Sequence, residues 1–210
     1  MQLDPILLPD LTTLRRRAKA LAMIDAIICP EWEYRYFSYD AHWHAEEEVA
    51  SMRNGSGDDW FLLFGPFGAA IKGLAHESTL AGDEAFARQV QTQVPVVFLG
   101  FLNEPAFGVG WLSYCYWRRN EDSVWHKVVA LDPKFADVND GSKEFLALLH
   151  ESADAYVTFA KHYYEVELPL AAVESIYRHE SLTDALVGAV NPDLTVADVK
   201  ASATTIGYPT

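Results

Sequence analysis

The sequence predicts an α+β fold with an antiparallel sheet of about five strands, an N-terminal helix and a helical C-terminal third. Three observations support this prediction. The chain opens with a helical pattern, its middle holds aromatic-rich segments typical of strands, and the pattern is helical again after Asp140-Gly141. Half of the 210 residues are apolar, enough to bury a sizeable core. We therefore expect one domain, in which residues 141–210 pack on the sheet-forming residues 1–140.

The first helix is expected from about Leu11 to Cys29. Apolar residues recur there at three- and four-residue steps, which gives one buried stripe. Asp10 can cap the first free amides, and Pro30 stops the helix. The later helices are predicted at residues 84–94, 95–103, 142–150, 153–166, 170–178, 183–190 and 197–204. Thr195 and Asp198 form a weak variant of the capping box at the start of the last helix.

Alternating or continuous apolar segments bounded by turn residues predict the strands. Residues 40–53 are instead predicted to form a short helix that leads into a glycine-rich turn. Most of the six tryptophans are expected in the core, because they lie at alternating positions of the strands. The five predicted strands cover residues 31–39, 60–64, 69–74, 110–118 and 123–130.

The formal net charge is −14 and the isoelectric point is near 4.8. A field of this sign repels nucleic-acid backbones and anionic membrane surfaces and attracts basic partners. Residues 31–60 carry eight carboxylates against two arginines, so they form an acidic pole. We therefore expect no nucleic acid or membrane as partner, and a basic protein as the partner that the charge favours.

Cys29 and Cys115 are the two cysteines, with no CxxC spacing, which fits a reducing compartment. Residues Met1–Pro5 lack the basic start and apolar run of a secretory signal. The longest apolar runs fall short of the roughly 20 residues that a spanning helix needs. These features predict a cytoplasmic protein.

The candidate binding site lies at one end of the hairpin that residues 52–77 form. A polar glycine-rich turn runs into one apolar strand, and the partner strand leads to a histidine and a glutamate. Functional groups of different chemical kinds can converge at such an end. The candidate residues are Arg53, Asn54, Ser56, Asp58, Asp59, Lys72, His76 and Glu77.

Each functional interpretation of this site has an alternative. The glycine turn lacks a preceding strand and the Gly-Lys-Ser/Thr of a phosphate loop, so a structural turn held by Arg53 pairing to Asp58 or Asp59 is favoured. A hydrolase could use Ser56, His76 and Asp58, but no Gly-x-Ser-x-Gly elbow is present and no catalytic residue is assigned.

Metal binding is the weakest interpretation. The segment His42-Trp43-His44-Ala45-Glu46 offers three ligand types, but a polar turn has the same composition. The three His-Glu pairs of the chain lack the second histidine of a zinc protease motif. We expect no metal and no cofactor.

Six segments of the chain form a recognisable set. They are Met52-Arg53-Asn54-Gly55-Ser56-Gly57-Asp58, Ile71-Lys72-Gly73, His76-Glu77-Ser78, Phe101-Leu102-Asn103-Glu104-Pro105-Ala106-Phe107, Trp117-Arg118 and Ile206-Gly207-Tyr208-Pro209. Through them the chain resembles a family of uncharacterised bacterial cytoplasmic proteins from about residue 34 onward. That resemblance assigns no reaction and no site residue. As a small, acidic, aromatic-rich α+β protein, the chain is also loosely similar to immunity proteins of polymorphic toxin systems.

Together these features favour an acidic protein-binding module of immunity or regulatory type. The tryptophans can anchor an interface, and the charge accelerates encounter with a basic partner. The alternative is a small-molecule-binding protein or hydrolytic enzyme with its site at the hairpin end. The sequence leaves the oligomeric state open.

Overall fold

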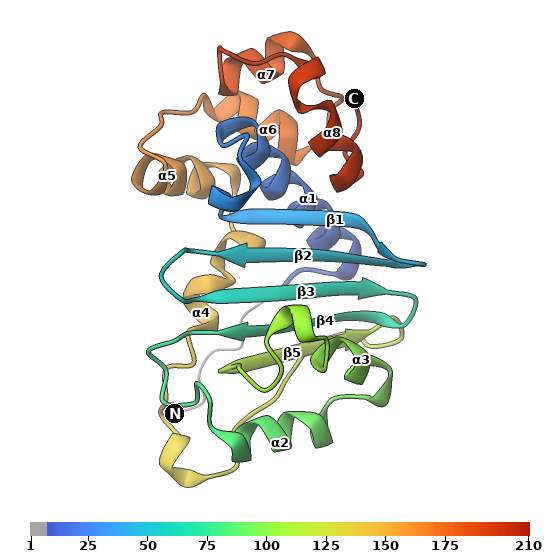
Figure 1. Ribbon diagram of the computed structural model, residues 1–210, viewed down its shortest axis with the longest axis vertical. Helices are drawn as coiled ribbons and strands as arrows, with labels where there is room; N and C mark the ends of the chain where they lie inside the picture. The colour runs from blue at the N-terminus through green and yellow to red at the C-terminus, as the bar shows by residue number, and fades with distance from the viewer. Residues whose placement is uncertain (1–7) are drawn as a thin grey trace.

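A computed structural model describes residues 8–210, so the predicted absence of a secretory signal at Met1–Pro5 lies outside the described residues. The α+β fold class is confirmed. One antiparallel sheet has six strands in the order of the sequence, β1 to β6, and helices lie on both faces and beyond one edge (Figure 1). The strands are β1 (Phe37–His44), β2 (Glu47–Arg53), β3 (Asp59–Gly65), β4 (Gly68–Leu74), β5 (Tyr114–Arg119) and β6 (His126–Lys127).

The helices follow the predicted segments within a few residues. Asp10 caps α1 by accepting from the amides of Thr12 and Thr13, both at 3.0 Å. Thr195 and Asp198 form the predicted capping box of α8. The helices are α1 (Leu11–Ile28), α2 (Glu84–Gln93), α3 (Leu99–Leu102), α4 (Ser142–Phe145), α5 (Ala153–Tyr163), α6 (Leu170–Tyr177), α7 (Asp184–Val190) and α8 (Val196–Ile206).

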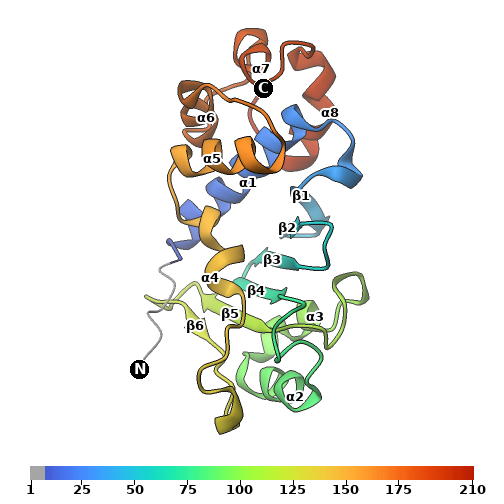
Figure 2. The same cartoon turned by 90° about the vertical axis from the view of Figure 1, so that its left-hand side faces the viewer.

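Strand residues alternate between the two faces of the sheet, and each face has its own apolar core. The back face packs on α1 and α4, and its core continues into α5 to α8 beyond the β1 edge. The front face, nearest the viewer in Figure 1, packs on α2 and α3. Figure 2 shows the sheet edge-on between these layers. The front helices cover β4 and β5, so β1 and β2 have no helix in front of them (Figure 1).

The prediction for residues 40–53 is wrong. This segment is the end of β1, a tight turn and the whole of β2, which adds the sixth strand. The turn has no glycine, and Glu46 takes the left-handed φ of 62° that glycine usually supplies. The glycine turn that follows is therefore preceded by a strand, contrary to the prediction. The first predicted strand also begins later than expected, because Trp32–Tyr34 form a 3₁₀ turn.

The tryptophans also depart from the prediction. Trp60 is fully buried on the back face, where its indole N–H donates to the Phe145 carbonyl at 2.9 Å. Trp32 and Trp111 are 57% and 62% exposed, since they lie in turns beside the sheet and not within strands. Large aromatic surfaces are thus available to a ligand.

A buried carboxylate joins the sheet to the helical third. Asp25 of α1 is fully buried, and it accepts from the Phe37 amide at 2.6 Å, from the Tyr164 hydroxyl at 2.7 Å and from the Tyr156 hydroxyl. The Tyr164 hydroxyl in turn accepts from the Tyr36 amide at 2.8 Å. Buried polar groups are costly unless they are paired, so this network fixes α1, β1 and α5 against one another.

No helix within residues 8–210 has both the length and the apolarity that crossing a bilayer requires.

Candidate functional site

The glycine turn between β2 and β3 is organised by Asn54. Its side-chain oxygen accepts from the amides of Ser56 at 2.8 Å and Asp58 at 3.1 Å, and its side-chain nitrogen donates to the Asp58 carboxylate at 2.6 Å. Gly55 and Gly57 have φ of 74° and 108°, which side-chain-bearing residues rarely adopt. The prediction that Arg53 holds the turn is wrong. The Asn54 side chain makes the hydrogen bonds that hold it instead.

Asp58 connects this turn to the end of β4. One carboxylate oxygen accepts from the His76 amide at 2.8 Å and lies 2.7 Å from Nδ1 of the His76 ring. The ring also packs over Gly57, where an added Cβ would lie 3.5 Å from it. Burial acts to raise the pKa of Asp58, but the hydrogen bonds from His76 and Asn54 outweigh it and lower that pKa below its usual range. Asp58 therefore stays ionised and orients the imidazole.

Arg53, Asp59 and Lys72 lie on the front face instead. Arg53 and Asp59 are directly opposite on β2 and β3, and Lys72 of β4 is fully buried. The Lys72 ammonium donates to the carbonyls of Leu102 at 3.3 Å and Gly108 at 3.2 Å. Lys72 thus fastens the segment around α3 to the sheet.

Burial shifts the pKa values of Asp59 and Lys72 toward each other. It raises the pKa of Asp59 to about 6, although Arg53 and Lys72 act to lower it. Burial also lowers the pKa of Lys72 to about 8, although the Asp59 charge acts to raise it. Both groups lose hydration without gaining a full ion pair, so each is closer to its neutral form at physiological pH than usual.

The structure therefore divides the predicted site residues. Asn54, Asp58 and His76 converge in one hydrogen-bonded group, whereas Arg53, Asp59 and Lys72 face the front of the sheet. Ser56 and Glu77 are exposed on the turn and after β4. The eight residues do not form one pocket, because neighbouring strand residues point to opposite faces of the sheet.

A cavity of about 480 Å³ lies beside the glycine turn, and we call it the hairpin cavity. Asn54 and Ser56 line its sheet side, and α4 and α5 supply the opposite wall. The hydroxyl of Tyr163 in α5 donates to the Asn54 carbonyl at 3.3 Å, which ties this wall to the turn. The full lining is Tyr36, Phe37, Asn54, Ser56, Glu144, Phe145, Leu148, Glu151, Ala155, Thr158, Phe159, His162 and Tyr163.

The hairpin cavity combines aromatic rings with carboxylates. The rings of Tyr36, Phe159 and Tyr163 are in mutual contact, with centroids 4.7 to 5.2 Å apart. Glu144 and Glu151 are exposed, and neither forms an ion pair with a residue of the described chain. No lysine or arginine is found among the described residues that line the cavity.

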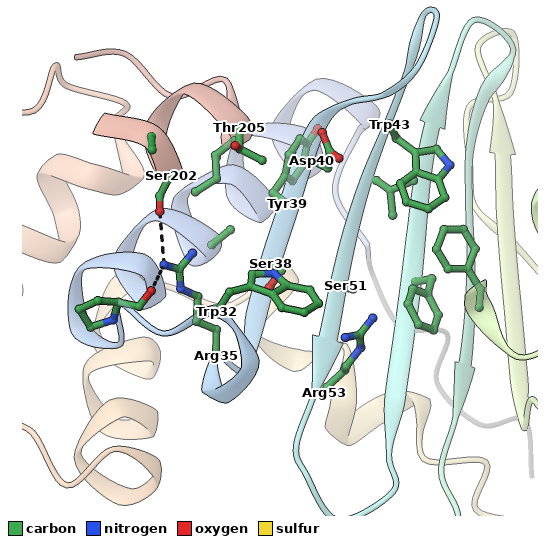
Figure 3. A pocket seen from close by; sticks show the side chains of 17 residues that line it. Trp32, Arg35, Ser38, Tyr39, Asp40, Trp43, Ser51, Arg53, Ser202 and Thr205 are labelled. Carbon is green, nitrogen blue, oxygen red and sulfur yellow. Dashed lines mark hydrogen bonds between the residues drawn. The ribbon is translucent and has the colours of Figure 1, made fainter. Parts of the chain in front are cut away.

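A second cavity, of about 500 Å³, lies over the front of β1 and β2, and we call it the front groove (Figure 3). Its floor is formed by the strands, and α8 and the 3₁₀ turn of Trp32 flank one side. Phe107 borders the other side, where it stacks on Phe61 with ring centroids 4.4 Å apart. Arg53 is the one predicted site residue in its lining.

The possible metal ligands His42, His44 and Glu46 are all exposed around the turn between β1 and β2. Within residues 8–210, no group of three or more histidine, cysteine, aspartate or glutamate side chains lies close enough to hold an ion. Cys115 is fully buried on the front face, and burial raises the pKa of its thiol to about 12, so it remains protonated.

Sequence patterns alone do not identify Glu144, Glu151 and Tyr163 in the hairpin cavity, or Trp32 and Ser38 in the front groove. Carboxylates beside aromatic residues in segment 144–163 are the only signal for the first set, and any amphipathic helix has that composition. Trp32 lies between two glutamates and Ser38 between two aromatic residues, in a segment that the pattern predicts as one strand. Neither set of residues can be recognised as lining a cavity until the tertiary contacts are known.

Comparison with known proteins adds no assignment to this geometry. No family model, no curated protein and no solved structure matches the chain.

Proposed function

We propose that this protein is an acidic protein-binding module of immunity or regulatory type, which acts in the cytoplasm on a basic protein partner. The observation that carries the proposal is the hairpin cavity, where Glu144 and Glu151 lie beside aromatic rings with no lysine or arginine in the described lining. The net charge of −14 adds a long-range attraction for a basic partner.

The cavity suits the side chain of an arginine or lysine from the partner. The apolar stem of such a side chain can lie against Phe159 and Tyr163, and its charged end can reach Glu144 or Glu151. Aromatic rings also attract a cation through their faces. A cavity of about 480 Å³ can hold one or two such side chains. Anchor residues at protein interfaces commonly insert into a pocket of the partner in this way.

The expected result of removing both carboxylates is a large loss of binding. In the double variant Glu144→Gln, Glu151→Gln, we expect the partner to bind at least about tenfold more weakly, because charge-assisted hydrogen bonds contribute roughly 1.5–3 kcal/mol each. The measurement is capture from lysate of the source organism by the tagged protein, with elution at rising salt and mass-spectrometric identification. The captured protein's affinity is then determined with each variant.

The matched control is Glu84→Gln, Asp193→Asn, which makes the same change in net charge on α2 and in the turn before α8. Both control residues are exposed and lie outside the hairpin cavity lining. Equal loss of binding in the two double variants would show that only net charge matters. A captured protein that is acidic, or that binds both double variants like the wild type, would contradict the proposal.

A second candidate function is a hydrolytic or small-molecule-binding enzyme at the hairpin end. The observation that favours it is the Asp58 and His76 pair, with 2.7 Å between the carboxylate oxygen and Nδ1. A neutral imidazole that donates from Nδ1 has Nε2 free to accept a proton, which is the arrangement of a general base. Because the His76 ring is exposed, a substrate can reach it.

For this second candidate, the expected result is hydrolysis of 4-nitrophenyl acetate that falls at least about 100-fold in His76→Ala and in Asp58→Asn. Exposed histidines react slowly with this ester without any site, so His150→Ala, at an exposed position, serves as the control. If wild type, His76→Ala and His150→Ala hydrolyse the ester at the same rate, the enzymatic candidate is excluded for such esters.

A further inference from the structure

The front groove differs from the hairpin cavity in the sign of its charge. Its charged lining residues are Arg35, Arg53 and Asp40, so two cations face one carboxylate in a strongly acidic protein. We propose that the front groove binds a small planar carboxylate, namely an aromatic ring acid with a hydroxyl substituent. This site is separate from the hairpin cavity, and its occupant is a small molecule and not a protein.

Arg53 is the anchor for the carboxylate. Its guanidinium lies 5.3 Å from the ring centroid of Trp32 and 5.6 Å from that of Phe61. These rings hold the guanidinium by cation–π contact, and within residues 8–210 no carboxylate forms an ion pair with it. Arg53 is exposed to solvent, so its N–H groups can donate to an incoming carboxylate in the paired geometry that arginine favours.

Arg35 adds a second positive charge that is fixed in place. Its guanidinium donates to the carbonyls of Cys29 at 2.8 Å and Pro30 at 2.6 Å. It also donates to the Ser202 hydroxyl at 3.3 Å, as Figure 3 shows. Within residues 8–210 no carboxylate forms an ion pair with Arg35, although the charges of Asp25 and Glu31 act on it from a longer distance. Arg35 therefore places a fixed positive charge beside the groove.

Aromatic surfaces make the groove suitable for a planar ring. Trp32 and Trp43 both project over the groove in Figure 3, and Trp43 also contacts Phe107 with ring centroids 5.1 Å apart. Stacking on such surfaces favours flat ligands. A volume of about 500 Å³ is within the range of small-molecule sites.

The floor of the groove offers hydrogen-bonding groups at a distance from Arg53. Ser38 and Ser51 are directly opposite on β1 and β2, and both line the groove. Asp40 lies two residues beyond Ser38 on the same face of β1. These groups can bind a hydroxyl on the ring while the carboxylate binds Arg53, which selects a ring acid with a polar substituent.

The surrounding charge excludes the larger anions that arginines often bind. A nucleic acid or an anionic membrane would meet the field of a chain with net charge −14 before it reached the groove. A small acid carries a single charge, so the same field, screened over about 8 Å at physiological salt, opposes it far less.

The test uses the indole N–H signals in NMR spectra of the full chain, titrated with 4-hydroxybenzoate, benzyl alcohol and benzylamine. We expect 4-hydroxybenzoate to shift the signals of Trp32 and Trp43, which are assigned from Trp→Phe variants. The buried Trp60 signal is expected to stay in place, because it lies on the back face. In Arg53→Gln, the affinity for 4-hydroxybenzoate is expected to fall about tenfold or more.

Arg88→Gln on α2 is the matched control, because it removes another exposed arginine, one that lies outside the groove lining. An unchanged Trp60 signal in Arg53→Gln shows that the variant is folded. The proposal is overturned if the alcohol or the amine binds as tightly as the acid, or if Arg53→Gln binds like wild type. It is also overturned if about 10 mM acid shifts neither indole, since that implies no useful affinity. None of these results depends on whether a basic protein binds the hairpin cavity.

Discussion

Replacing Asp25 with alanine is expected to lower the free energy of unfolding by about 4 kcal/mol. The substitution removes the acceptor for the Phe37 amide and for the hydroxyls of Tyr156 and Tyr164 in a fully buried place. The Phe37 amide and the Tyr156 hydroxyl would then be buried without an acceptor. Urea unfolding monitored by tryptophan fluorescence gives the free energy directly.

The control for this prediction is Asp193→Ala, at an exposed position in the turn before α8, with an expected change within about 0.5 kcal/mol. A loss of less than about 1 kcal/mol in Asp25→Ala would show that the network does not hold the helices to the sheet. If Asp25→Ala does not fold, Tyr164→Phe, which removes the hydrogen bonds to Asp25 and from the Tyr36 amide, is expected to cost about 2 kcal/mol.

The Asp25 carboxyl also has a defined effect of pH on stability. Burial raises its pKa in the folded protein to about 6, against an ordinary value of 3.8. Between these values only the folded protein keeps the proton, so this group's contribution to stability decreases as the pH rises from about 4 to 6. Asp25→Asn lacks that decrease. The free energy of unfolding of the wild type, measured relative to Asp25→Asn, should therefore fall by up to about 3 kcal/mol between pH 4 and 7. A difference that stays constant over this range would contradict the assigned pKa.

Replacing Gly73 with alanine is expected to destabilise the protein by about 3 kcal/mol. A Cβ at this position of β4 would lie 2.1 Å from the ring of Tyr114 in the neighbouring strand, and Tyr114 is fully buried. The ring cannot move away without disturbing the back-face core. Thermal unfolding should show a lower melting temperature by roughly 6–12 °C, since about 1 kcal/mol corresponds to 2–4 °C in a chain of this size.

Gly188→Ala is the matched control, because this glycine lies within α7 and an added Cβ meets nothing within 4 Å. Alanine has the higher helix propensity, so this variant is expected to be more stable by up to about 1 kcal/mol. The clash with Tyr114 is also tested by a double-mutant cycle. Gly73→Ala should cost much less in the Tyr114→Ala background, and an equal cost there would rule out the clash as the cause.

Most of the fold could be predicted from local patterns. The stripe of apolar residues and the cap at Asp10 locate α1, and the glycines around Pro66-Phe67 locate the hairpin of β3 and β4. The local pattern does not predict β2, because the segment opens with Glu46-Glu47-Glu48 and glutamate is uncommon in strands. The turn before β2 also has no glycine. The pairing of β2 with β1 and β3 outweighs that local preference.

The candidate site could be predicted only in part. Asn54, Asp58 and His76 do meet, because residues at the end of one hairpin are close in both sequence and space. The residues that complete the two cavities come from α5 and α8, about 100 residues or more along the chain from the strands they face. Asp25 had a signal as a lone carboxylate in the apolar run from Ala20 to Cys29, but its partners could not be identified.

Binding of a basic partner at the hairpin cavity remains our proposal. It is tested most directly by placing a photo-cross-linking amino acid at Ser56, which is exposed and lines that cavity, and the same amino acid at Asp193 as the control. After irradiation in the source organism, we expect a basic protein to be cross-linked at position 56 and not at 193. That product should disappear in Glu144→Gln, Glu151→Gln. A partner cross-linked equally at both positions, or one unaffected by the loss of both carboxylates, would contradict the account.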